Sequence, residues 1–450
     1  MARSERNVVQ MTKGSLWKNI LFFSVPLMLS QILEVLFNLS DIAVVGKFSG
    51  YIALGAVGST SLLVTLFTGF LIGMGSGVTV RTAHSLGERN EEVTRKTVYS
   101  SFIICIIMGL IVCVVAFSLS GSLLKLLNTK DELIEQAKLY LMIYSCGMPA
   151  LAIYNYGNGV LSALGDTKRP LIYLTFAGIL NVILNLIFVI GFHRAADGVA
   201  IASVISQYVS AFLILNNLLK REDTCKLILE KNNFDKAACK EVMLIGLPAG
   251  IQSAIFGIAN LFVQTGVNSF DAVLVSGNSA AANADNIIYT AMSAFYTACS
   301  SFMSQNYGAK KKDRILHSYF VSLVYSFAIG AVLGGLLLLF GKEFLSIFSS
   351  EEAVINAGME RLKIMGWSYC ISAFMDCTIA ASRGIGKSIP PMIIVIMGSC
   401  VFRIIWIYTI FAYFHTITSL YLLYSFSWTI TSIAEIIFFA YSYRKLARTL

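Results

Sequence analysis

The sequence has few charged residues, few prolines and few histidines for its length. Only 13% of its 450 residues are Asp, Glu, Lys or Arg, and it contains 6 prolines and 4 histidines. Soluble domains carry about 25% charged residues, whereas 56% of the residues here are hydrophobic. This composition excludes an ordinary soluble protein and indicates an integral membrane protein.

Patterns for catalysis or metal binding are also missing. The nine cysteines are not spaced in the pairs that hold a metal, and the four histidines lie in loops or at the ends of apolar segments. The glycine-rich run GFLIGMGSG, residues 69–77, lacks the phosphate-binding pattern and indicates close helix packing. We therefore expect neither an enzyme nor a resident cofactor.

The apolar residues occur in runs long enough to cross a membrane, which takes about 20 residues each. The predicted spans are 19–45, 53–80, 98–120, 136–160, 170–191, 197–219, 241–267, 274–303, 316–340, 357–381, 390–412 and 418–442. A charged segment between the sixth and seventh spans cannot cross. The sequence therefore predicts an all-α integral membrane protein of twelve transmembrane helices, with an N-terminal lobe at 1–220, a linker at 221–240 and a C-terminal lobe at 241–450.

The two sets of six spans are repeats of one another. Four positions recur 221 or 222 residues later: Pro26 as Pro248, Asn38 as Asn260, Gly165 as Gly386 and Pro170 as Pro391. Because each repeat has an even number of spans, both keep the same orientation in the membrane. This is the parallel kind of repeat, which is typical of transporters that work by alternating access.

Lys and Arg gather in the loops on one side of the predicted membrane. These basic loops are 81–96, 220–240, 310–314 and 444–448. The positive-inside rule places them in the cytoplasm, and the even number of spans then puts both termini there. The net charge of +9 therefore reports orientation in a plasma or inner membrane, and we expect no nucleic-acid partner.

The repeat breaks at a set of polar residues in the first half. Asp41, Asn181, Asn185 and Ser203 have apolar or aromatic counterparts, which are Val263, Phe402, Trp406 and Tyr424. Counting about 1.5 Å per residue from the ends of the spans, Asp41, Asn185 and Ser203 lie at one depth. Asn181 lies one turn deeper, on the same helix face as Asn185. A carboxylate, amide oxygens and a hydroxyl suit a small cation, so we expect a cation-coupling site with Na⁺ at Asp41, Asn181 and Asn185. The alternatives are a proton carried by Asp41, or asparagines that only join helices.

Asp41 also ends a polar stripe on the first span. Gln31, Glu34 and Asn38 fall on the same helix face as Asp41. An acidic group at the centre of a membrane helix costs about 2.5–3.5 kcal/mol on insertion scales, so such groups persist where they face water, an ion or a partner. We assign the stripe to a substrate cavity, against the alternative of polar packing in a helix bundle.

The second half has intramembrane charges of its own. We expect Arg403, the one basic residue deep in a predicted span, to form a structural ion pair with Asp376. Asp285 is then left to face the cavity and attract a cationic substrate, with Tyr289 nearby to stack on it. For each aromatic residue, ordinary packing is the alternative.

Several stretches together resemble the multidrug and toxic compound extrusion (MATE) family. They are P-x4-Q-x6-N-x2-D-x3-VG (26–46), ALGAVGSTS (53–61), LSALGDTKRP (161–170), NVILNLIF (181–188), GVAIASVISQ (198–207), GLPAGIQS (246–253), SFMSQNYGAKKKDR (301–314) and SRGIGKSIPP (382–391). The resemblance implies two six-helix lobes and export of cationic, amphipathic drugs against inward Na⁺ or H⁺. The family's cation site carries over to Asp41, Asn181, Asn185 and Ser203. Family members often have an aspartate where Asn185 stands, so both Na⁺ and H⁺ stay open as the coupling ion.

We therefore expect a monomeric secondary antiporter that exchanges small organic cations for Na⁺ or H⁺ and contacts only membrane lipids besides. The alternative is a lipid-linked saccharide flippase of the same superfamily. A flippase would need a cavity lined by several basic residues, whereas the predicted spans contain more acids than bases.

Overall fold

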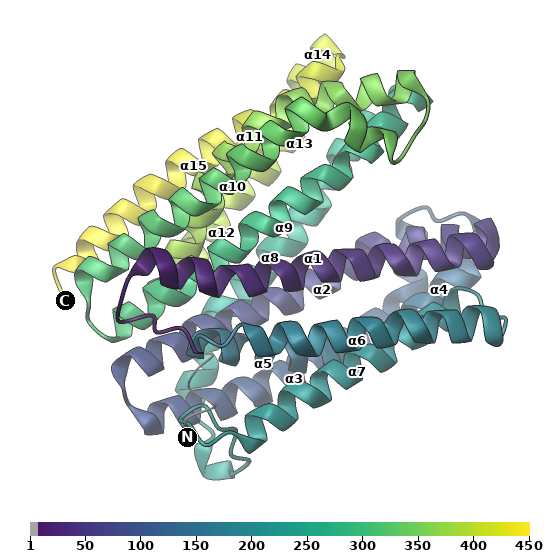
Figure 1. The fold of residues 1–450 in the computed structure, drawn as a ribbon. Coiled ribbons are helices and arrows are strands. Elements are labelled where there is room, and N and C mark those ends of the chain that lie inside the picture. The colour runs from purple at the N-terminus through teal and green to yellow at the C-terminus, as the bar shows by residue number, and fades with distance from the viewer. Residues whose placement is uncertain (1–7) are drawn as a thin grey trace. The chain divides into compact units, whose positions relative to one another are not determined.

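A computed structural model describes residues 8–450, and this part of the chain is helical with no strand (Figure 1). The helices of the first repeat are α1 (Leu16–Phe48), α2 (Gly50–Glu88), α3 (Glu91–Leu126), α4 (Asp131–Ser145), α5 (Met148–Leu164), α6 (Lys168–Leu186), the π-helical η2 (Ile187–Gly191) and α7 (Ala196–Lys220). The linker contains the short 3₁₀ helix η3 (Lys231–Asn233).

The second repeat contains ten helical elements. They are α8 (Lys236–Val267), α9 (Ala272–Gly308), α10 (Lys312–Ser346), α11 (Glu352–Gly384), α12 (Ile389–Val395), the π-helical η4 (Ile396–Val401), α13 (Phe402–Trp406), the π-helical η5 (Ile407–Phe411), α14 (Ala412–Phe414) and α15 (Ile417–Ala447). The elements from α12 to α14 follow one another without a gap and form one span.

The predicted spans all fall on these helices. Within the described residues, ten helices are individually long and apolar enough to cross a membrane. The remaining two predicted spans fall on α4 together with α5, and on α9. The prediction of an all-α membrane protein with twelve spans is therefore confirmed. The helices extend past the apolar runs, because polar residues at a membrane surface still continue a helix.

The fourth span is broken, whereas its counterpart in the second repeat is continuous. Cys146 and Gly147 separate α4 from α5, and Pro149 lies in the first turn of α5. Proline has no N–H to donate to the preceding turn, so the hydrogen-bond ladder is interrupted here. The position that corresponds to Pro149 is Cys370, and α11 runs through it unbroken.

The contacts divide the described chain into two compact units. The N-terminal unit contains residues 8–9 and 29–254, and the C-terminal unit contains 10–28 and 255–450. This grouping by contact differs from the boundaries at 220 and 241 that the repeat predicts. Both α1 and α8 pass from one unit to the other a few residues after Pro26 and Pro248, the prolines inside these helices.

The first part of α8 belongs to the N-terminal unit because glycines let it pack closely on α2. A Cβ atom at Gly73 would lie 2.3 Å from the nitrogen of Gly250, and one at Gly77 would lie 2.7 Å from the nitrogen of Gly246. Real Cβ atoms do not approach backbone this closely. Small residues spaced by four therefore bring the two helix backbones together, as is usual inside membranes.

The C-terminal unit holds residues 10–28 by different means. The Phe23 ring packs edge-on against Phe302 of α9, with 5.5 Å between the ring centroids. Arg314 and Asn306 both donate to the carbonyl oxygen of Met11, at 3.0 and 3.2 Å, and Met11 is buried. This segment is therefore held by large side chains and by hydrogen bonds to its carbonyl oxygens, whereas α8 is held on α2 by contacts between glycines.

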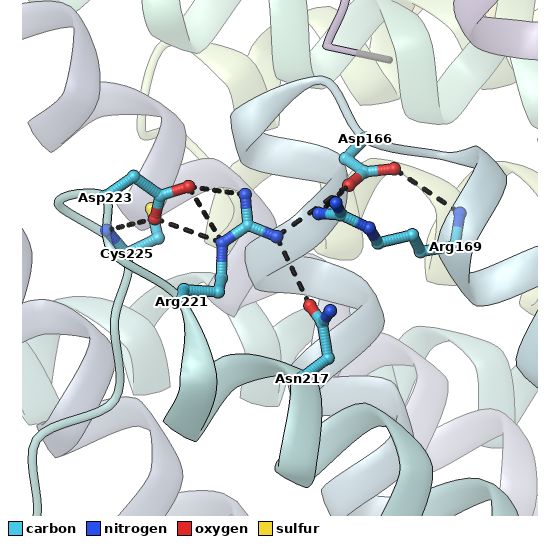
Figure 2. Close-up of polar contacts among 6 residues, drawn as sticks. All are labelled: Asp166, Arg169, Asn217, Arg221, Asp223 and Cys225. Atoms are coloured by element: carbon cyan, nitrogen blue, oxygen red, sulfur yellow. Dashed lines mark hydrogen bonds and ion pairs between the residues drawn. The ribbon is translucent and has the colours of Figure 1, made fainter. Parts of the chain in front are cut away.

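A buried charge cluster fixes the start of the linker to the N-terminal unit (Figure 2). Arg221 donates from Nε and from Nη2 to Asp223, both at short range, and from Nη1 to Asn217 at 3.2 Å. Its Nη1 also lies 3.7 Å from Asp166, whose fully buried carboxylate pairs with Arg169 at 2.8 Å. Burial raises the pKa of the neighbouring Cys225 thiol to about 12. The linker therefore begins as a packed part of this unit.

Candidate functional site

The four residues of the predicted cation site come together in the N-terminal unit. Asp41 lies near the end of α1, Asn181 and Asn185 lie on α6, and Ser203 lies on α7. Asn181 and Asn185 are one helical turn apart, so both point from the same face of α6. Because α1, α6 and the long apolar α7 supply one face each, residues far apart in sequence converge at one depth.

Hydrogen bonds join these four side chains into a closed ring. Asn185 Nδ2 donates to Asp41 Oδ1 at 2.5 Å, and Ser203 Oγ donates to Asp41 Oδ2 at 3.2 Å. Asn181 Nδ2 donates to Ser203 Oγ at 3.3 Å, and Asn185 Nδ2 also donates to Asn181 Oδ1 at 3.3 Å. Each carboxylate oxygen of Asp41 therefore has one neutral donor, and no basic side chain lies within 4 Å of it among residues 8–450.

Three members of the ring are buried, Asp41 is partly buried, and the ring contains one unsatisfied oxygen. Asn185 is fully buried, and Asn181 and Ser203 are buried as well. Within the described chain, no donor lies within hydrogen-bond distance of Asn185 Oδ1. An unsatisfied buried acceptor costs about 1–3 kcal/mol. Rotation of the Asn185 amide exchanges its NH₂ group and its oxygen, so this side chain can present either a donor or a ligand to the Asp41 side.

The charge of the ring fits a monovalent cation better than a divalent one. Asp41 is its single carboxylate, and the other members supply neutral oxygens. One Na⁺ or one proton neutralises this charge, whereas a divalent ion would leave a net positive charge in a buried place. Residues 8–450 contain no group of three or more His, Cys, Asp or Glu that could hold a metal ion. The oxygen atoms and the single charge of the ring therefore suit a hard, monovalent cation.

The polar stripe also lies on α1, between the start of this helix and Asp41. Glu34 and Asn38 are exposed, and Gln31 is partly buried. Their spacing keeps them on the face that carries Asp41. Their assignment to a substrate cavity stays a prediction.

The equivalent place in the C-terminal unit is filled by apolar and aromatic side chains. Val263 is 2% exposed and Trp406 is 8% exposed. Trp406 donates from Nε1 to the carbonyl oxygen of Ser419 at 2.9 Å, and its ring packs on Phe402 with 5.6 Å between centroids. The polar set of the first repeat therefore has no polar counterpart at these positions of the second.

The expectation that Asp285 has no basic partner is wrong. Arg361 of α11 donates to Asp285 from Nε at 3.1 Å and also from Nη2, and Tyr369 donates its hydroxyl to the same carboxylate. Arg361 further donates to Asn278 Oδ1 at 2.7 Å and lies over the Tyr421 ring. The charge of Asp285 is therefore compensated inside the unit.

Arg403 has partners other than the predicted one. It donates to Asn260 Oδ1 at 2.9 Å and to Ser427 Oγ at 3.3 Å, and its guanidinium lies 4.7 Å from the ring centroids of both Phe256 and Tyr424. Among the described residues, no ion pair within 4 Å joins Arg403 to Asp376. The structure thus does not bring the predicted pair together: Nε and Nη1 of Arg403 donate to Ser427 and Asn260 instead.

Sequence reasoning missed Arg361. Arg361 stands between Glu360 and Lys363, so it looked like part of a polar span end. The helix begins earlier, at Glu352, which puts Arg361 well inside it. Tyr289 is 52% exposed on α9, and its ring contacts Tyr296 at 6.4 Å. Its role in a cavity stays a prediction.

Twelve spans in two repeats, with a buried polar ring in one of them, define a polytopic membrane protein of the transporter class. The MatE family model matches residues 26–187 and 248–409, which is once in each repeat. The chain belongs to this family of multidrug and toxic compound extrusion transporters, and it is accordingly a transporter and not an enzyme.

Similarity to individual proteins supports this family assignment. The chain is 28% identical over 360 residues to the probable multidrug resistance protein YpnP of Bacillus subtilis, which covers 80% of each chain. It is 24% identical over 413 residues to the probable multidrug resistance protein NorM of Thermotoga maritima, covering 88% of this chain and 86% of that one. A solved transporter of the MOP superfamily from Pyrococcus furiosus has a TM-score of 0.90 at 22% identity, covering 98% of both chains, and shows the same fold.

Proposed function

We propose that the protein is a secondary antiporter that exports small organic cations in exchange for Na⁺ or H⁺. The observation that carries the proposal is the buried ring around Asp41, a carboxylate that only neutral side chains contact. A carboxylate in a membrane helix is costly, and this one has no basic partner within the described residues. The names of the multidrug relatives support small, chemically varied substrates.

The ring offers a direct way to couple the ion to the shape of the protein. A cation or proton at Asp41 removes the negative charge that the Asn185 and Ser203 donors now stabilise. The bonds from α6 and α7 to α1 then weaken, because hydrogen bonds to a charged acceptor are about twice as strong as those to a neutral one. Ion binding would therefore change how firmly the end of α1 is held.

The path of α1 extends this effect beyond the N-terminal unit. Residues 29–48 of α1 belong to that unit, and residues 16–28 belong to the C-terminal unit. A shift of α1 at Asp41 would pass along one continuous helix, with Pro26 as the place where it bends most easily. In this mechanism the ion site and the other unit are coupled through α1.

The exposed carboxylate of Glu34 and the amides of Gln31 and Asn38 would attract the substrate from the same helix. Their negative and polar character favours cationic substrates over anionic ones. The basic loops support an orientation with both termini in the cytoplasm. A chain with two repeats can work as a monomer.

The proposal is tested by dye efflux from everted vesicles. Ethidium movement is measured under separately imposed Na⁺ and H⁺ gradients, for the wild type, for Asp41→Asn and for Asp131→Asn, which changes an exposed carboxylate on α4. We expect Asp41→Asn to lose ion-driven transport and Asp131→Asn to keep it. Equal transport by the wild type and Asp41→Asn under both gradients would overturn the coupling role. A wild type that moves no organic cation would favour the lipid-linked saccharide flippase instead.

A further inference from the structure

A lipid-facing groove lies in the N-terminal unit between α1 and α6. It has a volume of about 560 Å³ and is lined by Leu29, Leu33, Leu171, Ile172, Thr175, Phe176 and Ile179. Thr175 is the one polar residue among them, and its hydroxyl already donates to the carbonyl oxygen of Leu171 at 2.8 Å. The groove therefore offers no hydrogen bond from these side chains, and only an apolar group fits it.

One end of the groove is closed where the two helices touch. The Phe37 ring of α1 lies directly against Gly178 of α6, where a Cβ atom would come within 1.8 Å of the ring. Phe37 is one helical turn before Asp41, and Gly178 is three residues before Asn181. The groove therefore ends just below the polar ring and extends from there toward the start of α6.

A basic residue stands at the open end. Lys168 is the first residue of α6 and is exposed. The spacing 168, 172, 175, 179 follows i, i+4, i+7, i+11, so Lys168 lies on the same helix face as the groove lining. The neighbouring Asp166 is paired with Arg169 and Arg221, and no ion pair within 4 Å involves Lys168 among the described residues.

We propose that this groove binds one acyl chain of an anionic phospholipid, whose headgroup lies at Lys168. The walls lie in two membrane spans, so the groove lies at the depth of the hydrocarbon interior of the bilayer. From Leu171 to Ile179 the groove is about 12 Å long at 1.5 Å per residue, so a chain enters from the leaflet at Lys168 and stops under Phe37. A Lys near a membrane surface attracts an anionic lipid by about 1 kcal/mol, which is about fivefold in affinity. The charge at the open end thus selects the lipid, and the apolar walls hold its chain.

Lipid retention by the purified protein tests this proposal without any measurement of transport, so its outcome is independent of the proposed function. Protein is exchanged into mild detergent with equal amounts of phosphatidylglycerol and phosphatidylcholine, washed, and the lipid held per chain is counted by mass spectrometry. We expect the wild type to keep phosphatidylglycerol over phosphatidylcholine by about fivefold. Thr175→Trp fills the groove and should lose most of this lipid. Ile183→Trp should keep it, because Ile183 is an exposed position on the same helix as Thr175 but lies past the contact with Phe37 that ends the groove.

Two further variants separate the headgroup from the chain. Lys168→Gln should lose the preference for phosphatidylglycerol and still hold a chain, and Lys220→Gln, an exposed lysine at the end of α7, should behave as the wild type. Phe176→Trp places a fluorescent side chain in the groove wall without filling it, so phosphatidylglycerol with brominated chains should quench it more than it quenches Ile183→Trp. Equal retention by Thr175→Trp and Ile183→Trp, equal quenching at positions 176 and 183, or a wild type with no preference for phosphatidylglycerol would each overturn the proposal.

Discussion

The two units are both helical, and they differ in the side chains that contact a carboxylate inside each unit. In the N-terminal unit, Asp41 accepts hydrogen bonds from an amide and a hydroxyl, which are both neutral donors. In the C-terminal unit, Asp285 is neutralised by Arg361, which packs over Tyr421. The first arrangement is open to an added cation, and the second already contains its own.

This difference shows how a duplicated fold can take on two tasks. Both repeats have six spans, while a few positions change the local charge balance inside each unit. A net negative site can be switched by an ion, whereas a neutral, hydrogen-bonded pair stabilises one arrangement. In the proposed function, the ion acts at the N-terminal unit.

The largest effect should follow from breaking the pair in the C-terminal unit. Arg361→Met leaves the partly buried carboxylate of Asp285 without its basic partner, which costs up to about 3–5 kcal/mol. The free energy of unfolding in detergent should fall by that amount, and the double variant Arg361→Met with Asp285→Asn should recover most of it. Lys363→Met removes an exposed charge two residues away and should change little. A single variant as stable as the wild type would show that the pair does not stabilise the unit.

The matching change in the N-terminal unit should leave stability nearly intact and remove the response to the ion. Asp41→Asn takes away a charge that has no basic partner, so we expect the free energy of unfolding without Na⁺ to stay within about 1 kcal/mol of the wild type. If Na⁺ is the coupling ion, a concentration of 100 times its Kd should stabilise the wild type by about 2.7 kcal/mol and leave Asp41→Asn unchanged. Thermal unfolding in sodium chloride and in choline chloride measures both. A sodium response that survives in the variant would place the ion elsewhere.

A smaller effect is expected from the hydroxyl of the ring. Ser203→Ala removes one donor to Asp41 and one acceptor for Asn181, and one hydrogen bond contributes about 1 kcal/mol. This donor stabilises the ion-free carboxylate, so its loss should lower the concentration of ion that half-saturates efflux about fivefold. Ser427→Ala is the control in the other unit, because it removes an acceptor of Arg403 and should leave the ion dependence as it is. Equal shifts in both variants would mean that the hydroxyl of Ser203 acts only on stability.

The smallest effect concerns the substrate and not the ion. Glu34 is exposed, so Glu34→Gln should leave the unfolding free energy unchanged and raise the KM for ethidium by about two- to fivefold, as expected for a screened charge. The KM for a neutral dye and the ion dependence should not change. An unchanged KM for ethidium would remove Glu34 from the substrate path.

The polar ring could be predicted from the sequence because it leaves two independent signals there. The second repeat replaces Asp41, Asn181, Asn185 and Ser203 by apolar or aromatic residues, and counting residues from the span ends puts all of them except Asn181 at one depth. The structure joins these residues by hydrogen bonds. The twelve spans are likewise a direct consequence of hydrophobic length.

The polar centre of the C-terminal unit could not be predicted in the same way. Whether Arg403 reaches Asp376 or Asn260 depends on the rotation of each helix about its own axis, which span positions do not give. Arg361 was hidden by Glu360 and Lys363, since three charges in four residues look like a loop. The grouping of helix parts into units is also tertiary information, because it depends on which glycines meet between α2 and α8.

The sharing of α1 and α8 has a consequence for biosynthesis. A ribosome has made the whole first repeat by residue 220, yet the N-terminal unit still lacks residues 236–254 and the glycines through which they pack on α2. Conversely, residues 10–28 leave the ribosome first and wait for α9 and α10 to be inserted before they find their place. Neither repeat is therefore a self-sufficient folding unit. The first repeat must stay in the membrane without its complete packing until α8 is inserted. A chain cut at the linker yields two fragments that each lack part of their own core.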